Sequence, residues 1–289
     1  MSSPQHRRGH CLLRCPLCKF ELTAAADALV CRNRHSFDLA REGYVNLLRS
    51  RRRWPAAGGD GATQLRHRAE FLGAGHLDGI AAMIAERFAQ PNAQPQLDRW
   101  CILDAGSGTG HHLARIAVTL ARPVIGLGLD ISRDATRQAS RRWPTLAFAV
   151  SDLWAEWPVR DTAVDLVVSI FAPRNFPEAV RVLRPGGWLV LGYPGPDHLI
   201  ELRSRFGLLR QREGNARRYG EIAQRVVGQT SAVPLRSRVV LDQAAMRSAV
   251  LMGPNAYHVD PSILDVEPGP IAVTFDITLL FAQKPESNP

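Results

Sequence analysis

The stretch WCILDAGSGTG, at residues 100–110, decides the fold of this chain. Its apolar run ends at Asp104, and Gly106, Gly108 and Gly110 follow at alternate positions. Glycine is needed where a backbone turns sharply or approaches a ligand closely, because any Cβ would collide there. A helix that begins just after such a turn presents unpaired N–H groups, which favour an anionic or electron-rich ligand. The stretch therefore predicts a buried strand, a ligand-binding glycine turn and a helix.

The spacing of these glycines separates two classes of cofactor site. A dinucleotide site favours G-x-G-x-x-G, which would require glycine at the position that His111 occupies. The observed D-x-G-x-G-x-G pattern resembles motif I of S-adenosylmethionine-dependent methyltransferases. The resemblance implies that Asp104, Gly106, Gly108 and Thr109 contact S-adenosylmethionine.

Two further apolar runs end in acidic residues. The run at residues 124–130 places Asp130 about 20 residues after the glycines, where a carboxylate can accept both hydroxyls of a ribose. The alternative is that Asp130 caps a helix that begins near Ser132. The run at 146–152 ends in Asp152, which can accept an adenine amino group or cap a helix. The runs and the glycines together indicate a nucleoside cofactor.

Strands and helices alternate through this part of the chain, which is typical of a parallel doubly wound sheet. The sequence also predicts a helical region at 63–88 that is broken near its middle, and two more parallel strands at 164–173 and 183–191. A capped helix is expected at 242–251 and an antiparallel strand at 273–281. We therefore expect an α/β fold of the class I (Rossmann-like) methyltransferase type. His198 follows the fifth strand, where a side chain faces the ligand crevice of such a sheet.

Four residues near the N-terminus have the spacing of a zinc site. Cys15, Cys18, Cys31 and His35 form the pattern C-x₂-C-x₁₂-C-x₃-H. Thiolates and an imidazole on two tight turns can converge on one tetrahedral Zn²⁺, and the metal supplies folding energy that so short a segment lacks. Cys11 is a spare cysteine at poorer spacing, so we expect a small N-terminal domain with a structural zinc ion.

The block SFDLAREGYVNLL at residues 36–48 follows the zinc pattern directly. The zinc pattern, this block and the methyltransferase core, in this order, resemble the large-subunit (23S) ribosomal RNA guanine-N1-methyltransferases along essentially the whole chain. The segments at 110–113, 171–175 and 252–258 resemble the branch of that family that confers resistance to tylosin-type macrolides. The resemblance implies methylation of a guanine in a ribosomal RNA hairpin loop by a homodimer. It also implies that Leu77 and His198 lie against the cofactor, although Leu77 is equally suited to core packing.

Composition agrees with a soluble protein that binds a polyanion. The 289 residues are 45% hydrophobic and 22% charged, and no apolar run approaches the roughly 18 residues that span a bilayer. An odd number of cysteines argues against a disulfide framework, so we expect a cytoplasmic protein. The formal net charge of +9 favours RNA, although Arg-rich coding produces similar charge. We divide the chain into a zinc-binding RNA-recognition domain (1–48), a basic flexible linker with the run RSRRR (49–63) and a methyltransferase domain (64–289).

The segment after the predicted fourth strand suggests how a base is held. FAPRN, at residues 171–175, departs from the Asn/Asp-Pro-Pro-aromatic motif of enzymes that methylate exocyclic amines, and fits a ring nitrogen better. Our hypothesis is that Phe171 stacks on the extruded base while Arg174 donates toward guanine O6. The alternatives are an ion pair for Arg174 and a core position for Phe171. The sequence identifies no general base. Two other functions remain open, namely a small-molecule methyltransferase and a zinc-containing RNA-binding protein without activity.

Overall fold

The computed structural model describes residues 7–48, 61–89, 98–209, 215–266 and 269–286. Its centre is an eight-stranded sheet in the order β10-β11-β9-β8-β5-β6-β7-β4. Strands β4 to β9 are parallel, and β11 is antiparallel to both β9 and β10. The bounds are β4 Val45–Asn46, β5 Trp100–Ala105, β6 Val124–Asp130, β7 Ala147–Val150, β8 Val164–Ile170, β9 Leu183–Pro194, β10 Gln229–Leu241 and β11 Ile271–Gln283.

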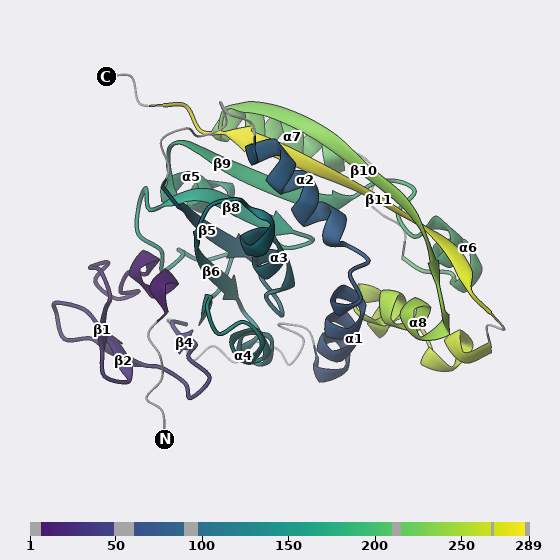
Figure 1. The fold of residues 1–289 in the computed structure, drawn as a ribbon, viewed down its shortest axis with the longest axis horizontal. Coiled ribbons are helices and arrows are strands. Elements are labelled where there is room, and N and C mark those ends of the chain that lie inside the picture. Colours follow the sequence, from purple (N-terminus) through teal and green to yellow (C-terminus); the bar gives the residue numbers. More distant parts are fainter. Residues whose placement is uncertain (1–6, 49–60, 90–97, 210–214, 267–268, 287–289) are drawn as a thin grey trace.

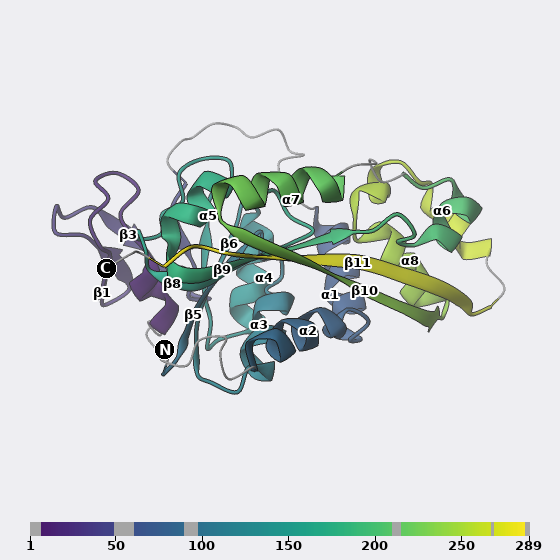
Figure 2. The same cartoon turned by 90° about the horizontal axis from the view of Figure 1, so that it is seen from above.

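Helices cover both faces of this sheet (Figure 1). Figure 2 shows α2 and α3 on one face and α5 and α7 on the other. The α-helices are α1 Ala62–Gly73, α2 Asp78–Ala89, α3 His111–Thr119, α4 Arg133–Arg142, α5 Phe176–Val182, α6 Ile200–Phe206, α7 Asn215–Val226 and α8 Gln243–Leu251. Short 3₁₀ helices are η1 Arg8–Leu12, η2 Pro254–Tyr257 and η3 Pro261–Val266.

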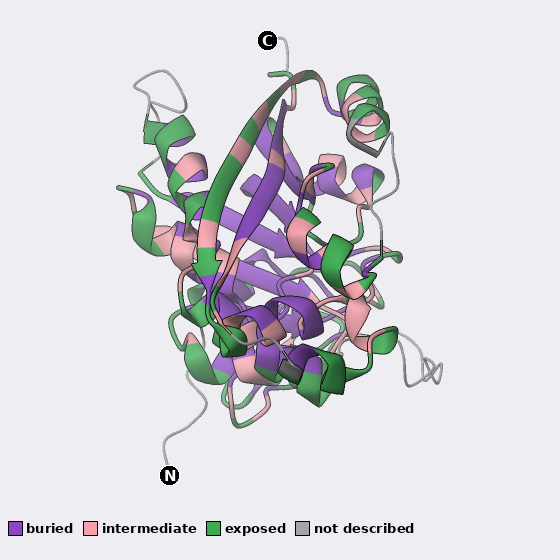
Figure 3. Ribbon diagram, turned by 90° about the vertical axis from the view of Figure 1, so that its right-hand side faces the viewer, coloured by how far each residue is buried: buried purple, intermediate pink, exposed green. Residues whose placement is uncertain are grey.

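The central strands form the core because nearly all of their side chains are apolar. Every residue of β5, β7 and β8 is buried, as expected for parallel strands with helices on both faces (Figure 3). The chain leaves β5 toward β6 on one side and returns through β8 on the other, so strand order reverses at β5. Ligands bind at such a reversal, outside the carboxyl ends of the strands.

Most predicted elements of this doubly wound sheet are confirmed. The helical region is split between α1 and α2, and Asp242 caps α8 by accepting a hydrogen bond from the Ala245 N–H at 2.8 Å. The predicted antiparallel strand is present as β11, but it lies between β9 and β10. The sequence did not reveal β10, α6 or α7. Helix α1 begins at Ala62, inside the predicted linker, and residues 49–60 of that linker lie outside the described part of the chain.

The N-terminal segment forms a small antiparallel sheet, which we call the ribbon (residues 8–39). Its strands are β1 Thr23–Ala25, β2 Ala28–Val30 and β3 Ser36–Asp38. The ribbon is docked closely on the large sheet, since a Cβ on Gly9 would stand 2.2 Å from the carbonyl oxygen of Gly126 in β6. The Arg7 guanidinium donates to the carbonyl oxygens of Leu146 and Ser140 at 2.8 and 2.9 Å.

No helix in the described ranges is both long and apolar enough to cross a membrane.

Candidate active site and metal centre

The carboxyl ends of four neighbouring strands bring most of the predicted cofactor residues to one edge of the sheet. Strands β6, β5 and β8 are paired in parallel, and β7 is paired with β6. Gly106 therefore follows β5, Asp130 ends β6, Asp152 follows β7 and Phe171 follows β8, all at the same edge. We call this edge the crevice.

The glycine turn is built as the D-x-G-x-G-x-G pattern requires. Gly106, Gly108 and Gly110 have φ values of +89°, +52° and +75°, a conformation that side chains disfavour. A Cβ on Gly106 would stand 2.3 Å from the Cβ of Ala172, and one on Gly110 would stand 2.7 Å from the Phe148 ring. Gly106 therefore lets the glycine turn pack directly against the loop after β8.

Asp130 links the glycine turn to the start of α4. Its Oδ2 accepts a hydrogen bond from the Gly108 N–H and its Oδ1 accepts one from the Ser132 N–H, each at 2.8 Å. The N-cap of α4 is Ser132, whose hydroxyl accepts from the Ala135 N–H. Asp130 is therefore not the cap, and the two hydrogen bonds hold its carboxylate at the strand end.

Two buried polar atoms beside the glycine turn have no hydrogen-bond partner among the described residues, and they are Asp104 Oδ2 and Ser107 Oγ. Burial, and then the charge of Asp130, raises the pKa of Asp104 to about 7. Buried polar groups are normally satisfied, so unpaired ones at a glycine turn suit a site where a ligand supplies the partner. The turn and its polar atoms thus fit a nucleoside cofactor with an amino-acid moiety.

The other predicted cofactor residues surround this edge. Asp152 Oδ1 accepts from the Trp154 N–H at 2.9 Å in a turn that no helix follows directly, so Asp152 does not cap a helix. Thr109 is buried, and Leu77 is packed in the hydrophobic core. Burial lowers the pKa of His198 to about 4, so its ring is neutral at pH 7. Their roles toward the cofactor stay predictions.

Phe171 does not lie in the core and Arg174 makes no ion pair with a described residue, so neither alternative from the sequence applies. Phe171 is 41% exposed and has a φ of +53°, strain that non-glycine residues adopt mainly where function holds them. Its ring centroid lies 5.8 Å from that of His198. The Arg174 guanidinium is stacked 4.0 Å from the Tyr219 ring centroid and makes no ion pair with a described residue. Stacking occupies the face of the guanidinium and leaves its in-plane N–H groups able to donate, and the buried Nε has no hydrogen-bond partner among the described residues, so donation toward a base stays a prediction.

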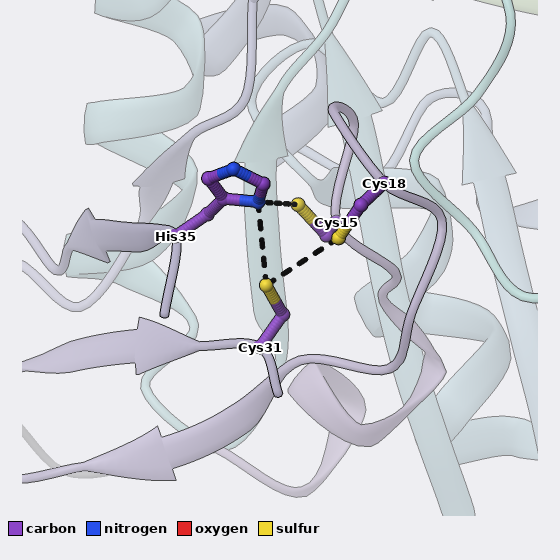
Figure 4. A group of neighbouring side chains, drawn as sticks. All are labelled: Cys15, Cys18, Cys31 and His35. Carbon is purple, nitrogen blue, oxygen red and sulfur yellow. Dashed lines mark hydrogen bonds between the residues drawn. The ribbon is translucent and has the colours of Figure 1, made fainter. Parts of the chain in front are cut away.

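The four predicted metal ligands converge (Figure 4). Their ligand atoms lie within 4.8 Å of one another. Cys18 Sγ lies 3.5 Å from Cys31 Sγ, and His35 Nδ1 lies 3.5 Å from the sulfur atoms of both Cys15 and Cys31. These separations are close to the roughly 3.8 Å between thiolates on one tetrahedral Zn²⁺. The three thiolates and the imidazole therefore fit a structural zinc ion.

Two tight turns present these ligands. The Lys19 N–H donates to the Cys15 carbonyl and the Arg34 N–H donates to the Cys31 carbonyl, each at 2.8 Å. Lys19 and Arg34 both have positive φ, near +65° and +62°, which folds each turn back on itself. The spare Cys11 is exposed and lies outside the ligand cluster.

Sequence reasoning missed Arg68, which reaches from α1 to the glycine turn. A Cβ on Gly108 would stand 3.5 Å from Arg68 Nη1. An arginine on a helix that precedes the first strand has no distinguishing spacing, so no sequence signal could have found this contact.

Comparison with known proteins agrees with both parts of the structure. Residues 13–52 match the family model described as "RlmA, N-terminal", a zinc ribbon, and residues 102–187 match the model described as "Methyltransferase domain". The chain is 39% identical to the 23S rRNA (guanine(748)-N(1))-methyltransferase of Streptomyces fradiae, over 92% of this chain and 94% of that protein.

Two further relatives carry related names. A putative 23S rRNA (guanine-N(1)-)-methyltransferase of Micromonospora griseorubida is 40% identical, over 92% of this chain and 95% of that protein. The Bacillus subtilis protein YxjB, with the same putative name, is 33% identical over 94% of this chain and 97% of that protein. With a class I methyltransferase fold and relatives that match nearly end to end, the chain belongs to the 23S rRNA (guanine-N1)-methyltransferase family.

Proposed function

We propose that this protein methylates N1 of a guanine in a hairpin loop of 23S ribosomal RNA, using S-adenosylmethionine. The observation that carries the proposal is the crevice, where the glycine turn and Asp130 lie beside the exposed ring of Phe171. The names of the relatives, matched over more than nine-tenths of the chain, support the substrate. Resistance to tylosin-type macrolides and cytoplasmic residence belong to the same proposal.

The crevice residues have chemically distinct tasks in this proposal. S-adenosylmethionine supplies an activated methyl group when it is bound. The Asp130 carboxylate accepts from the ribose hydroxyls, and Asp152 accepts from the adenine amino group. Asp104, Gly106, Gly108 and Thr109 form the turn that holds the cofactor, and Leu77 and His198 lie against it.

Phe171 is the residue that we assign to the base. A guanine must leave its stack before its N1 can react, and an aromatic ring at the rim of the crevice compensates by stacking on it. The Phe171 N–H donates to the Gly192 carbonyl at 2.9 Å, and Arg174 packs against Tyr219. The first contact ties the loop after β8 to β9 and the second ties it to α7, so Arg174 helps to position Phe171.

The ribbon has a different task. In the proposal Cys15, Cys18, Cys31 and His35 hold Zn²⁺, and the zinc-binding domain (1–48) reads the RNA hairpin by shape and phosphate contacts. The linker (49–63) adds its basic run, and the methyltransferase domain (64–289) carries the chemistry. A homodimer, inferred from resemblance, would bring two ribbons to one hairpin.

The test is methylation of protein-free 23S ribosomal RNA with labelled S-adenosylmethionine, followed by primer extension. N1 methylation blocks base pairing, so we expect a single reverse-transcription stop at a guanine in a hairpin loop. Label transfer without a stop would contradict the N1 assignment. Absence of transfer by a protein that binds the cofactor would instead favour a small-molecule methyltransferase.

A further inference from the structure

One side chain lies against Gly108 of the glycine turn. Gly108 has a φ of +52°, and a Cβ placed on it would meet, among the described residues, only Arg68 within 4 Å, with Nη1 at 3.5 Å and Cδ at 3.9 Å. By contrast, the same construction on Gly106 or Gly110 meets core atoms at less than 3 Å. Gly108 is buried, and the guanidinium of Arg68 is the group that covers it.

Arg68 is held in this position by the elements that flank it. Its Nη2 donates to the carbonyl of Met252, just after α8, at 2.7 Å. Helix α1 is itself fixed to α8 and η2, because Gln64 Nε2 donates to the Gly253 carbonyl at 3.1 Å and His67 hydrogen-bonds Ser248 at 3.0 Å. A cation that is already oriented loses little conformational freedom when it binds an anion.

Charged groups of both signs lie around the glycine turn. Asp104 ends the strand that leads into the turn and accepts a backbone hydrogen bond from Leu113 in α3, and Asp130 accepts from the Gly108 N–H. Arg68 adds a positive charge beside Gly108, close to the start of α3 at His111. The pKa of His112 falls to about 3 because of burial, with the neighbouring His111 and Arg68 as further causes. The cation at Arg68 therefore favours an anion near Gly108.

The amino-acid part of S-adenosylmethionine is a zwitterion that can pair with charges of both signs at the turn. We propose that Arg68 binds the carboxylate of the cofactor, an assignment that rests on the proposed function. The cofactor ammonium would then face Asp104. Arg68 thereby connects α1, which follows the linker, to cofactor binding.

The test compares the affinities of two ligands by calorimetry, without RNA. The probes are S-adenosylmethionine and decarboxylated S-adenosylmethionine, which differ only by the carboxylate. In Arg68→Ala we expect the affinity for the first to fall about ten- to hundredfold, as for a lost charged hydrogen bond, while the affinity for the second changes less than about twofold. The matched control is Arg66→Ala, an exposed arginine of the same helix, which should change neither affinity.

Arg68→Gln provides a second variant that removes the charge but keeps a hydrogen-bond donor for the Met252 carbonyl, in case the alanine variant does not fold. An equal loss of both affinities, or no loss of the first, would overturn the assignment of Arg68 alone. Wild-type protein that bound neither ligand would overturn the proposed function as well, so the two failures are distinguishable.

Discussion

The ribbon and the large sheet are stabilised in different ways. The ribbon has strands of three residues, β1 is exposed throughout, and its buried leucines Leu13, Leu22 and Leu29 belong to the same apolar cluster as residues of the large sheet. Its own distinguishing feature is a set of four ligand atoms that converge within 4.8 Å. The strands β5, β7 and β8, by contrast, are buried along their whole length. One chain thus combines a small segment that carries a metal-ligand cluster with a methyltransferase core that folds by burial.

The largest expected effect is removal of the metal from the ribbon. Structural zinc contributes on the order of 10 kcal/mol in small metal-binding folds, so Cys31→Ser should abolish zinc binding and amide protection in β1 to β3. Cofactor binding should stay within about threefold, because the crevice belongs to the sheet. Metal analysis, hydrogen exchange and calorimetry measure these three quantities.

The matched control is Cys11→Ser, since Cys11 is exposed and outside the cluster. It should leave zinc content and protection unchanged. If the ribbon kept its amide protection without zinc, the metal would not be what stabilises β1 to β3.

The next effect lies in the sheet, at Gly106. Alanine there would bring a Cβ 2.3 Å from Ala172 and requires a φ of +89°, so Gly106→Ala should cost about 1–3 kcal/mol and weaken cofactor binding. Gly207→Ala is the control, because Gly207 also has positive φ (+62°) but has nothing within 4 Å of its Cβ position. Urea unfolding measures both. Equal destabilisation would show that the contact with Ala172 is unimportant.

The next prediction concerns how the stability of the large-sheet region depends on pH through His198. Burial holds the pKa of His198 at about 4, whereas an unfolded histidine titrates near 6.5. Between these values the unfolded state binds more protons, so this contribution to stability is complete above about pH 6.5 and declines as the pH falls toward 4. Between pH 7.5 and pH 5 the free energy of unfolding should therefore fall by about 2 kcal/mol because of His198.

His198→Gln should remove this loss. The difference between free energies of unfolding at pH 7.5 and pH 5 should therefore be about 2 kcal/mol smaller in the variant than in the wild type. The raised pKa of Asp104 changes stability in the opposite direction, but it is present in both proteins. An identical pH dependence in the two proteins would show that His198 titrates normally.

The smallest expected effect is at the junction between α4 and β4, the strand of the large sheet that follows the ribbon. The Tyr44 hydroxyl, next to β4, accepts a hydrogen bond from Arg133 Nε at the start of α4, at 3.0 Å. Tyr44→Phe keeps the buried ring and should cost about 1 kcal/mol in urea unfolding. Tyr257→Phe is the matched control, since it removes a hydroxyl that bonds Gln64 at the other end of the molecule. Only Tyr44→Phe should also loosen the amides of β4, as hydrogen exchange would reveal; unchanged β4 protection would contradict the junction.

The two regions also differ in how much their sequences reveal. The zinc ligands could be identified because the metal fixes their spacing. Strands β5 to β9 could be identified because buried parallel strands are continuous apolar runs. Strand β10 was missed because its residues are largely exposed, with Pro234 and Arg236 in its middle, and only its pairing with β11 over thirteen positions defines it. Edge strands tolerate such residues.

The candidate site was predictable only where it follows strand ends. Asp130 and Asp152 could be assigned to the crevice edge because the carboxyl ends of parallel strands meet. Arg68 could not, since its approach to Gly108 depends on how α1 is fixed to α8. The position of Arg174 against Tyr219 likewise depends on α7, a helix that the sequence did not reveal.

As a 23S rRNA (guanine-N1)-methyltransferase, this protein should produce 1-methylguanine in 23S ribosomal RNA. The most direct measurement is nucleoside digestion of the RNA after reaction with the purified protein, followed by chromatography and mass spectrometry, which separate the isomeric methylguanosines. We expect 1-methylguanosine alone, at one residue per RNA molecule. Methylation at another position of guanine, or on another base, would contradict it.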